Sequence, residues 1–325
     1  CKCRTHASSS AALSWNRWLS WHPICSSQVV SPPANDLPNY SKREMKILHS
    51  HAQLQQWRSG FTVASTLGLV PTMGALHKAH ATLFVTARPL CDQVLASVFI
   101  NPLQFERPDD LKAYPRTLAQ DLEMLESLHV DAVYLPTPED MYPEGFVTGV
   151  VPGPCGDRFE GAARPGHFAG MLTVVLKLFQ RCQPHIAFFG QKDAQQLFLV
   201  RRMVEDFDLP LTIQECPTLR EDDGLAFSSR NARLSSAARK QALVLHQSLT
   251  AAADAFQAGE RNPRRLEAWM QACFEGSPAE LVYAAVVDDR RFESASTSAT
   301  LPWRAVVGAR LEGVHLLDNL PLRTV

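Results

Sequence analysis

Residues 67–80 read L-G-L-V-P-T-M-G-A-L-H-K-A-H, and residues 186–193 repeat their order of strand, glycine turn and helix start. An apolar run leads into a glycine turn and then into an Ala- and Leu-containing segment, which predicts a strand, a tight turn and a helix start. A helix start offers unpaired N–H groups and the positive end of the helix dipole, which suit phosphate. His77 and His80 would share one face of that helix. The stretch therefore predicts a nucleotide phosphate site.

The same stretch also has a purely structural interpretation. A strand, a glycine turn and a helix occur throughout α/β proteins, and most such turns bind nothing. Two histidines at this spacing can be ordinary surface residues. The two interpretations stay open until the rest of the chain is considered.

Size and composition are ordinary for a soluble globular protein. The chain has 325 residues, of which 46% are hydrophobic and 20% charged, which is enough for two domains of about 100–200 residues each. The net charge of −1, with no sustained basic run, argues against a nucleic-acid or anionic-membrane surface. Apolar stretches such as 171–179 are too short to span a bilayer. The eight cysteines contain no C-x-x-C pair and are interpreted as reduced, mostly buried thiols of an intracellular protein.

Residues 1–44 differ in composition from the rest of the chain. No acidic residue precedes Asp36, and Ser, Ala and Trp are common. We expect a disordered or transit-like extension. Either it targets an organelle or it was never part of the fold, and Met45-Lys46-Ile47 resembles a natural start. Cytoplasmic localisation is the simplest expectation.

Strands and helices alternate from Ile47 to Asn231. Val94–Ile100 predicts a buried parallel strand, and further strands are expected over 132–135, 186–189 and 211–214. This alternation predicts a parallel, doubly wound sheet over residues 45–233. Residues 234–325 predict a smaller C-terminal α+β domain, with two helices over about 236–258 and 263–275 and short strands near 281–287, 305–309 and 314–317.

Polar residues follow several of the predicted strands, where parallel sheets bind ligands. Asn101-Pro102 is interpreted as a turn signal, whereas Gln104 is a candidate site residue. Lys192 and Gln196 can share a face of the helix after the strand 186–189; alone, a surface lysine would be the simpler interpretation of Lys192. The hydroxyls and arginine of 228–230 suit a mobile loop that closes over phosphates. The Pro- and Gly-rich segment 136–168 predicts a functional or disordered loop.

Several well-known catalytic motifs are absent from the sequence. It holds no G-x-x-x-x-G-K-[ST] loop, no G-x-G-x-x-G fingerprint, no G-x-S-x-G elbow and no H-E-x-x-H zinc motif. Serine hydrolases and metalloproteases therefore fit poorly. The residues alone predict a nucleotide-binding α/β enzyme, with nucleotidyl transfer as the candidate chemistry.

From about Met45 to its end, the chain resembles the pantothenate synthetase (pantoate–β-alanine ligase) family. The resemblance rests on seven motifs that occur in the family's order. They are Pro71–His80, Val98–Phe105 (V-F-I-N-P-L-Q-F), Tyr114–Thr117 (Y-P-R-T), Arg164–Phe168 (R-P-G-H-F), Phe189–Gln196 (F-G-Q-K-D-A-Q-Q), Pro217–Arg220 with Asp223–Asn231 (P-T-L-R and D-G-L-A-F-S-S-R-N), and Leu316–Leu320 (L-L-D-N-L).

The resemblance implies a fold, a reaction and partners. The fold would be a Rossmann-like nucleotidyltransferase domain that binds ATP and pantoate, followed by a C-terminal lid. The reaction would join pantoate and β-alanine into pantothenate through a pantoyl adenylate, releasing pyrophosphate and AMP. Magnesium would accompany ATP, and the enzyme would be a homodimer. Neither nucleic acid nor membrane is an expected partner, as the charge balance indicates.

The resemblance also implies residue roles. His80 would be the proton donor, with His77 and Lys192 also catalytic, while Gln104 and Gln196 would hold pantoate and β-alanine. Magnesium ligands are not identified, and Asp121 is a candidate without support. The implied ATP-binding residues are Met73, Gly74, Ala75, Leu76, His77, Lys78, Ala79, His80, Gly190, Gln191, Lys192, Asp193, Leu219, Phe227, Ser228, Ser229 and Arg230.

The chain departs from the family's usual residues at several of these positions. Ala79 replaces a glycine, Lys78 an acid, Gln191 a glutamate, Ala194 a tyrosine and Phe227 a methionine. The Ala79 methyl would stand where backbone approaches the nucleotide, so we expect activity with altered ATP affinity. Two alternatives remain: another adenylyltransferase of the same fold, or a catalytically weak paralogue kept as a binding or dimerisation protein.

Overall fold

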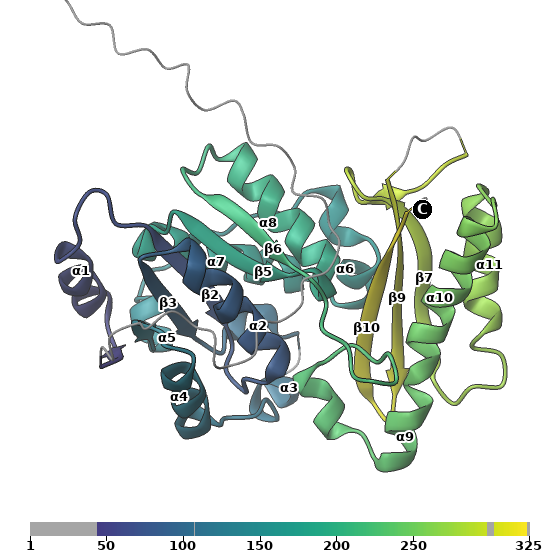
Figure 1. Cartoon of the computed structure of the whole chain (residues 1–325), viewed down its shortest axis with the longest axis horizontal. Helices are drawn as coiled ribbons and strands as arrows, with labels where there is room; N and C mark the ends of the chain where they lie inside the picture. Colours follow the sequence, from purple (N-terminus) through teal and green to yellow (C-terminus); the bar gives the residue numbers. More distant parts are fainter. Residues whose placement is uncertain (1–43, 107, 298–301, 324–325) are drawn as a thin grey trace, which may run out of the picture. The chain divides into compact units, whose positions relative to one another are not determined.

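A six-stranded, entirely parallel sheet forms the first part of the computed structural model, which describes residues 44–106, 108–297 and 302–323 (Figure 1). The strand order is β1-β4-β3-β2-β5-β6. All but Glu44 of the predicted extension lies outside the described residues. The strands are β1 (Lys46–Leu48), β2 (Leu67–Thr72), β3 (Gln93–Val98), β4 (Ala132–Tyr134), β5 (Ile186–Gly190) and β6 (Thr212–Cys216).

Helices cover both faces of this sheet. Since side chains alternate along a strand, neighbouring residues pack against helices on opposite faces. On one face, Leu69 of β2 belongs to a core shared with α1 (His51–Ser59), α7 (His167–Cys182) and α8 (Ala194–Asp206). On the other face, its neighbour Val70 packs with α2 (Lys78–Ala87) and α4 (Leu118–Ser127). The predicted doubly wound α/β class is therefore confirmed.

A second, antiparallel sheet has the strand order β10-β9-β7-β8. Helices α10 (Leu243–Gln257) and α11 (Pro263–Ala272) pack on one of its faces around Phe256 and Trp303. From its other face, Val287 and Val306 pack with Ala194 at the start of α8. The strands are β7 (Glu280–Asp288), β8 (Glu293–Ser294), β9 (Trp303–Leu311) and β10 (Val314–Leu322).

Two expectations for this second part are wrong in detail. The helix expected over about 236–258 is split into α9 (Ser236–Gln241) and α10, with Ala242 between them. The strands expected to be short are nine residues long in β7, β9 and β10, because β9 pairs along its whole length with β10. We propose residue 233 as the boundary between the parts, since β6 precedes it and α9 follows it.

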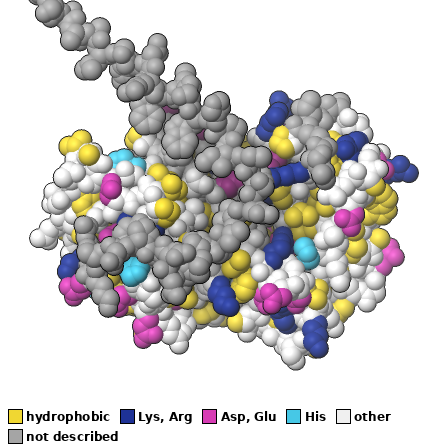
Figure 2. Space-filling model, viewed as in Figure 1, with side chains coloured by type: hydrophobic (Ala, Val, Ile, Leu, Met, Phe, Trp, Pro, Cys, Tyr) yellow, Lys and Arg dark blue, Asp and Glu magenta, His cyan; other side chains and the backbone are white. Residues whose placement is uncertain are grey.

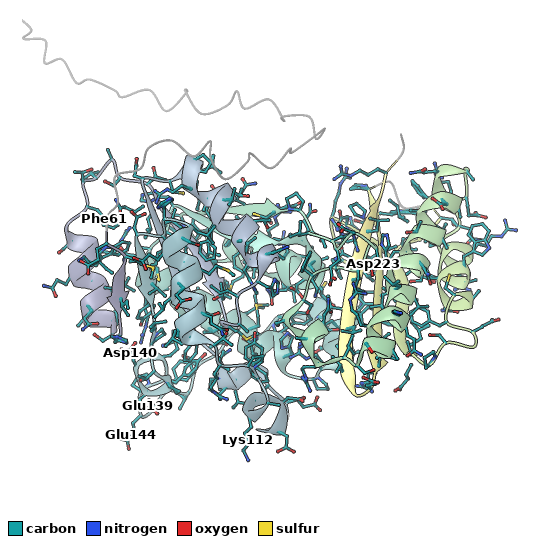
Figure 3. All side chains as sticks on the ribbon, turned by 60° about the horizontal axis from the view of Figure 1, so that its bottom comes forward. Phe61, Lys112, Glu139, Asp140, Glu144 and Asp223 are labelled. Atoms are coloured by element: carbon teal, nitrogen blue, oxygen red, sulfur yellow. The ribbon has the colours of Figure 1, made fainter. Side chains whose placement is uncertain are left out.

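The segment 136–168 is irregular, as expected, but it contains short helices, α5 (Pro138–Met141) and α6 (Glu160–Ala163). Asp140 of α5, labelled in Figure 3, ties this segment to the sheet. Its Oδ2 accepts hydrogen bonds from the Tyr134 hydroxyl at 2.6 Å and from Arg181 Nη1 at 2.6 Å. Other short elements are α3 (Pro108–Lys112), η1 (Arg88–Leu90), η2 (Pro102–Gln104), η3 (Pro154–Asp157), η4 (Gln191–Asp193) and η5 (Ser229–Arg233).

A buried ion pair joins the end of α2 to the neighbouring strands. Arg88 Nη1 lies 2.6 Å from Asp131 Oδ2, and the two side chains are only 6% and 10% exposed. The Arg88 guanidinium also donates to the carbonyls of Cys91, Asp92 and His129. Asp131 Oδ2 in turn accepts the Val94 N–H, at 2.7 Å, beside the start of β3. One side chain therefore satisfies four acceptors where α2, β3 and β4 meet.

The mixed surface charges and the free thiols match what the composition predicts. On the face shown in Figure 2, acidic and basic side chains are interspersed. No helix within the described residues is long and apolar enough to cross a membrane. The cysteines in the described part of the chain are unpaired: Cys91, Cys182 and Cys216 are buried, and Cys155 and Cys273 are partly exposed.

Candidate active site

A pocket of about 290 Å³ lies beyond the carboxyl ends of the parallel strands. In the strand order, β3 and β6 lie on opposite sides of the neighbouring pair β2 and β5. The chain therefore turns in opposite directions after β2 and after β5. Such a switch point between neighbouring strands leaves a crevice where α/β sheets bind ligands. Residues 315–319 of β10 complete the pocket wall from the second sheet.

The turn after β2 is held by a carboxylate from α4. Gly74 and Ala75 adopt left-handed backbone, with φ of 80° and 52°. In that conformation the amides of Ala75 and Leu76 point to Asp121, whose two oxygens accept them at 3.0 and 2.8 Å. Asp121 is 2% exposed and also accepts the Thr117 hydroxyl. These amides therefore bind a side chain and not a ligand. The predicted phosphate site loses these two backbone N–H donors. Both Asp121 oxygens are already engaged, which argues against this residue as a metal ligand.

The helix start itself keeps the features that suit an anion. His77 is the N-cap of α2, and its ring centroid lies 4.1 Å from that of His80. The His77 backbone N–H donates to His80 Nδ1 at 3.3 Å. Because Nδ1 accepts, the neutral His80 ring carries its proton on Nε2 and can donate from there. The amides of Lys78 and Ala79 have no partner among the described residues.

Both histidines are neutral at pH 7. Burial lowers the pKa of His77 to about 4, with a further contribution from the nearby Lys192 charge. Burial likewise lowers the pKa of His80 to about 3, and His77 adds to this effect. At the start of α2 the nearby positive charge is therefore that of Lys192 and not of the two histidines.

Gln104 is fixed by a residue whose role the sequence did not indicate. Asn101 caps η2 by accepting the Leu103 N–H, as a turn signal should, but its amide also donates to Gln104 Oε1 at 3.1 Å and to Gly170 O at 3.0 Å. Gln104 Nε2 then donates towards Met73 Sδ at 3.1 Å, at the pocket wall. A Cβ on Gly170 would lie 2.1 Å from Leu103 O, so only glycine lets α7 reach η2.

The turn after β5 presents two candidate groups. Lys192 lies in η4, and its only ion-pair partner among the described residues is Asp193, at 3.8 Å. Gln196 follows in the first turn of α8, and its carboxamide has no hydrogen-bond partner in the described part of the chain. Gln191 points elsewhere, because its amide donates to Glu215 on β6. Lys192 and Gln196 therefore keep polar groups available to a ligand.

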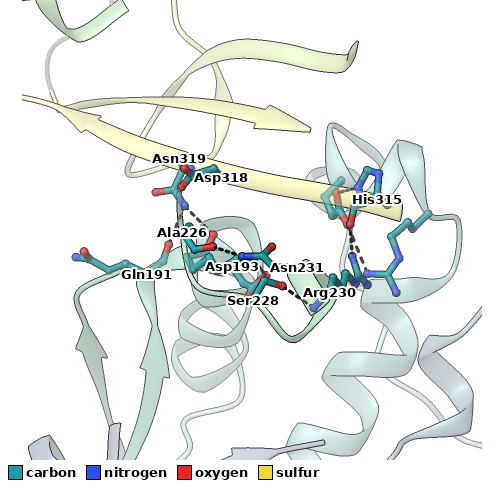
Figure 4. Close-up of polar contacts among 12 residues, drawn as sticks. Gln191, Asp193, Ala226, Ser228, Arg230, Asn231, His315, Asp318 and Asn319 are labelled. Atoms are coloured by element: carbon teal, nitrogen blue, oxygen red, sulfur yellow. Dashed lines mark hydrogen bonds and ion pairs between the residues drawn. The ribbon is translucent and has the colours of Figure 1, made fainter. Parts of the chain in front are cut away.

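The loop 227–230 closes the pocket against the second sheet. Ser228 Oγ accepts the Arg230 N–H at 3.2 Å, and Arg230 Nη1 donates to His315 O of β10 at 3.1 Å (Figure 4). The Phe227 ring is stacked near His77 with centroids 6.4 Å apart. The predicted phosphate loop is thus anchored to β10.

A charged group that the sequence did not predict lies beside Arg230, where β10 meets α6. His315 Nε2 is 2.7 Å from Glu160 Oε2, and Arg164 Nη1 is 3.4 Å from Glu160 Oε1. Burial alone would raise the pKa of Glu160, but the hydrogen bond from His315 and the charges of His315, Arg164 and Arg230 bring it to about 2. Glu160 and His315 are far apart in sequence, so no local pattern could pair them.

The structure brings most of the predicted site residues to this one pocket. Those that line it are Met73, His77, Ala79, His80, Gln104, Gly190, Lys192, Asp193, Gln196, Leu219, Phe227, Ser228, Ser229 and Arg230. Five do not line it, because Gly74, Ala75 and Leu76 turn towards Asp121, Lys78 is exposed and Gln191 bonds to Glu215.

The pocket offers little to a metal ion on its own. No group of three histidine, cysteine or acidic side chains suited to a metal occurs among the described residues. Of the pocket carboxylates, Glu160 and Asp318 are paired with His315 and Arg220 respectively, and only Asp193 is lightly engaged. A magnesium ion bound here would be held mainly by the phosphates of a nucleotide, and Asp193 is the lightly engaged carboxylate that could contact it.

A doubly wound parallel sheet with a cation-lined pocket at its switch point defines a Rossmann-like nucleotide-binding protein. The family model for pantoate–β-alanine ligase matches residues 46–321. The pantothenate synthetase of Chloroflexus aurantiacus is 45% identical over 279 residues, covering 85% of this chain and 97% of the relative. That of Cereibacter sphaeroides is 43% identical over 278 residues, covering 83% and 96%.

Solved structures agree with these relatives. The pantothenate synthetase of Thermus thermophilus superposes with a TM-score of 0.80 at 41% identity, covering 85% of this chain and 99% of that one. The Francisella tularensis pantoate–β-alanine ligase, solved with β-γ ATP and β-alanine, gives a TM-score of 0.71 at 34% identity, covering 87% and 99%. The chain therefore belongs to the pantoate–β-alanine ligase family, and the predicted enzyme class is confirmed.

Proposed function

We propose that the chain joins pantoate and β-alanine to form pantothenate through a pantoyl-adenylate intermediate, with ATP as co-substrate. The observation that carries this proposal is the convergence of His80, Gln104, Lys192, Gln196 and Arg230 on one pocket. The F. tularensis relative that binds β-γ ATP and β-alanine supports it.

In the first step, a carboxylate oxygen of pantoate attacks the α-phosphorus of ATP. The bond from that phosphorus to the bridging oxygen breaks, and pyrophosphate leaves with the bonding electrons. Lys192 and Arg230 balance the charge that develops on the phosphates, and His80 donates a hydrogen bond from Nε2. Burial by the surrounding protein keeps the His80 ring neutral, which supports a role as a neutral donor rather than as an imidazolium acid.

Pantoate is held by neutral amides in this proposal. The Gln104 carboxamide is oriented by Asn101, and the Gln196 carboxamide is free to bond to a hydroxyl or carboxylate of the substrate. In the second step, the neutral amine of β-alanine attacks the acyl carbon, the bond to the adenylate oxygen breaks, and AMP leaves with the bonding electrons and takes up the proton that the nitrogen loses. The wall formed by α6 and β10 helps to exclude water from the hydrolysable adenylate.

Other implied features remain predictions. Magnesium would arrive with ATP, neutralise phosphate charge and contact the protein through Asp193. The homodimer follows from the resemblance alone, and the cytoplasmic localisation follows from the scattered, unpaired cysteines. The alternative, a catalytically weak paralogue kept as a binding or dimerisation protein, rests on Ala79 and Ala194. Ala79 lines the pocket within the first turn of α2, outside the left-handed backbone region that would require glycine.

Product analysis tests the proposed function directly. Pantoate alone should support exchange of labelled pyrophosphate into ATP, because adenylation is reversible, whereas rapid AMP release should require β-alanine as well. Both measurements use the full chain with magnesium. Pantoate-independent exchange would point to another adenylyltransferase, and binding of ATP without either reaction would favour the weak paralogue.

The pH dependence tests the proposed state of the histidines. Both rings are neutral well above pH 4, so the adenylation rate should not decline as the pH rises through 6.5, their ordinary pKa. As the pH falls from about 6.5 to about 4, the unfolded chain binds more protons at these sites than the folded chain does. The free energy of unfolding should therefore fall over this range. Pyrophosphate exchange and denaturant unfolding from about pH 5 to about pH 8 check both. A steady decline in rate above pH 6.5 would indicate an imidazolium donor.

A further inference from the structure

Asn319 of β10 spans from the second sheet to the turn that carries Lys192. It is 4% exposed. Its Nδ2 donates to the carbonyl oxygens of Gln191 at 2.9 Å and of Lys192 at 2.7 Å, as part of the polar network in Figure 4. No other side-chain amide in the described residues donates to both of these carbonyls.

The orientation of the Asn319 carboxamide is fixed by a charged neighbour. Arg304 Nη1 donates to Asn319 Oδ1 at 2.6 Å, and Arg304 itself pairs with Asp289 at 2.6 Å. A guanidinium can only donate, so the Asn319 oxygen has to face it and the NH₂ group has to face the turn. Both ends of the carboxamide are therefore committed.

These hydrogen bonds act on the part of the turn that directs Lys192. The Lys192 side chain is 20% exposed, and its Asp193 partner lies 3.8 Å away. Because that contact is long, it restrains the ammonium only weakly. The position of the turn backbone therefore sets the region that the Lys192 side chain can reach. Each carbonyl that Asn319 binds also shares a peptide group with the N–H of the next residue, so its donation polarises the N–H groups of Lys192 and Asp193.

We propose that Asn319 is a positioning residue for the adenylation step, holding the Gln191–Lys192 turn so that Lys192 meets the phosphates. The phosphate ligand in this statement rests on the proposed function. The structural part, that Asn319 orders the turn, rests on the two hydrogen bonds alone.

Two substitutions test the positioning role. Asn319→Ala removes the donor, whereas Asn319→Asp keeps the shape and the Arg304 contact but turns a carboxylate oxygen towards two carbonyls. We expect pyrophosphate exchange to fall by about 10- to 100-fold in both, the scale of a misplaced catalytic group, with the KM for pantoate nearly unchanged. Asn262→Ala, which removes an N-cap from α11 in the same part of the molecule, is the matched control and should keep the wild-type rate.

A double-mutant cycle separates positioning from general damage. If Asn319 acts through Lys192, Asn319→Ala should cost less than about threefold in a Lys192→Ala background, because contacting residues are not additive. If the two losses multiply, Asn319 does not work through Lys192 and the proposal is wrong.

Hydrogen exchange gives a readout that does not depend on catalysis. In Asn319→Ala, the amides of residues 191–196 should exchange faster, whereas in Asn262→Ala only those near α11 should. Unchanged exchange over 191–196 would overturn the inference even in an active enzyme. If the wild-type chain does not adenylate pantoate, the proposed function fails, and faster exchange in Asn319→Ala still supports the ordering of the turn.

Discussion

Replacing His80 with alanine should lower pantoate-dependent pyrophosphate exchange by about 100-fold or more, the scale of losing one donor aimed at developing charge. The His77 amide holds His80 Nδ1, so the Nε2–H is the group lost from the pocket. The KM for pantoate should change little, because Gln104 and Gln196 remain. Single-turnover measurement of pyrophosphate release would determine the rate of the chemical step.

A second substitution at His80 distinguishes the two ways in which this ring could act. The glutamine carboxamide in His80→Gln reaches about as far as Nε2 and donates a neutral N–H, but it cannot act as an acid. If His80 is a neutral donor, His80→Gln should recover part of the rate lost in His80→Ala. Equal rates in the two variants would favour proton transfer, and unchanged adenylation in His80→Ala would remove His80 from the mechanism. The exposed His49 provides the control, since His49→Ala should be fully active.

Replacing Arg88 with alanine should have the largest effect on stability, about 3–5 kcal/mol less free energy of unfolding. The loss comes from the buried Asp131 carboxylate, which would be left without its cation, and from three carbonyls that would lose a donor. Denaturant unfolding monitored by fluorescence would measure this loss.

Arg202 supplies the matched control for Arg88. It also makes short contacts to carboxylates, those of Glu205 and Asp206, but its side chain is 49% exposed. Water and salt screen such a pair, so Arg202→Ala should cost less than about 1 kcal/mol. Equal losses of unfolding free energy in the two variants would show that burial of the Arg88–Asp131 pair adds nothing to stability.

The parallel sheet could be predicted because its strands are buried on both faces and therefore form continuous apolar runs. The run 94–100 predicts β3 within two residues at its C-terminal end. By contrast, β1 and β8 have three and two residues that are mostly exposed, so neither forms an apolar run like that of the equally short but buried β4. Strand β9 runs two residues beyond the expected 305–309 at each end, and those ends contain the charged residues Arg304, which is buried against Asp289, and Arg310.

The candidate site could be predicted where its residues follow strands. Parallel strands bring their carboxyl ends to one edge, so Gln104 and Lys192 had to lie near the turn after β2. The sequence could not show that Asp121 occupies two amides of that turn, since an acidic residue on an amphipathic helix normally faces solvent. Nor could it show that Glu160, Arg304 and Asn319 support the site, because their partners depend on how the second sheet packs.

The dependence of the site on β10 also has a consequence for the order in which the molecule is made. Synthesis proceeds from the amino end, so Asn319 leaves the ribosome after every residue of the parallel sheet. That sheet has its own core and could fold while the turn at Lys192 still lacks its two hydrogen bonds. If Asn319 positions Lys192 as proposed, a nascent chain matures in two stages, and it reaches its full adenylation rate after the last strand has docked.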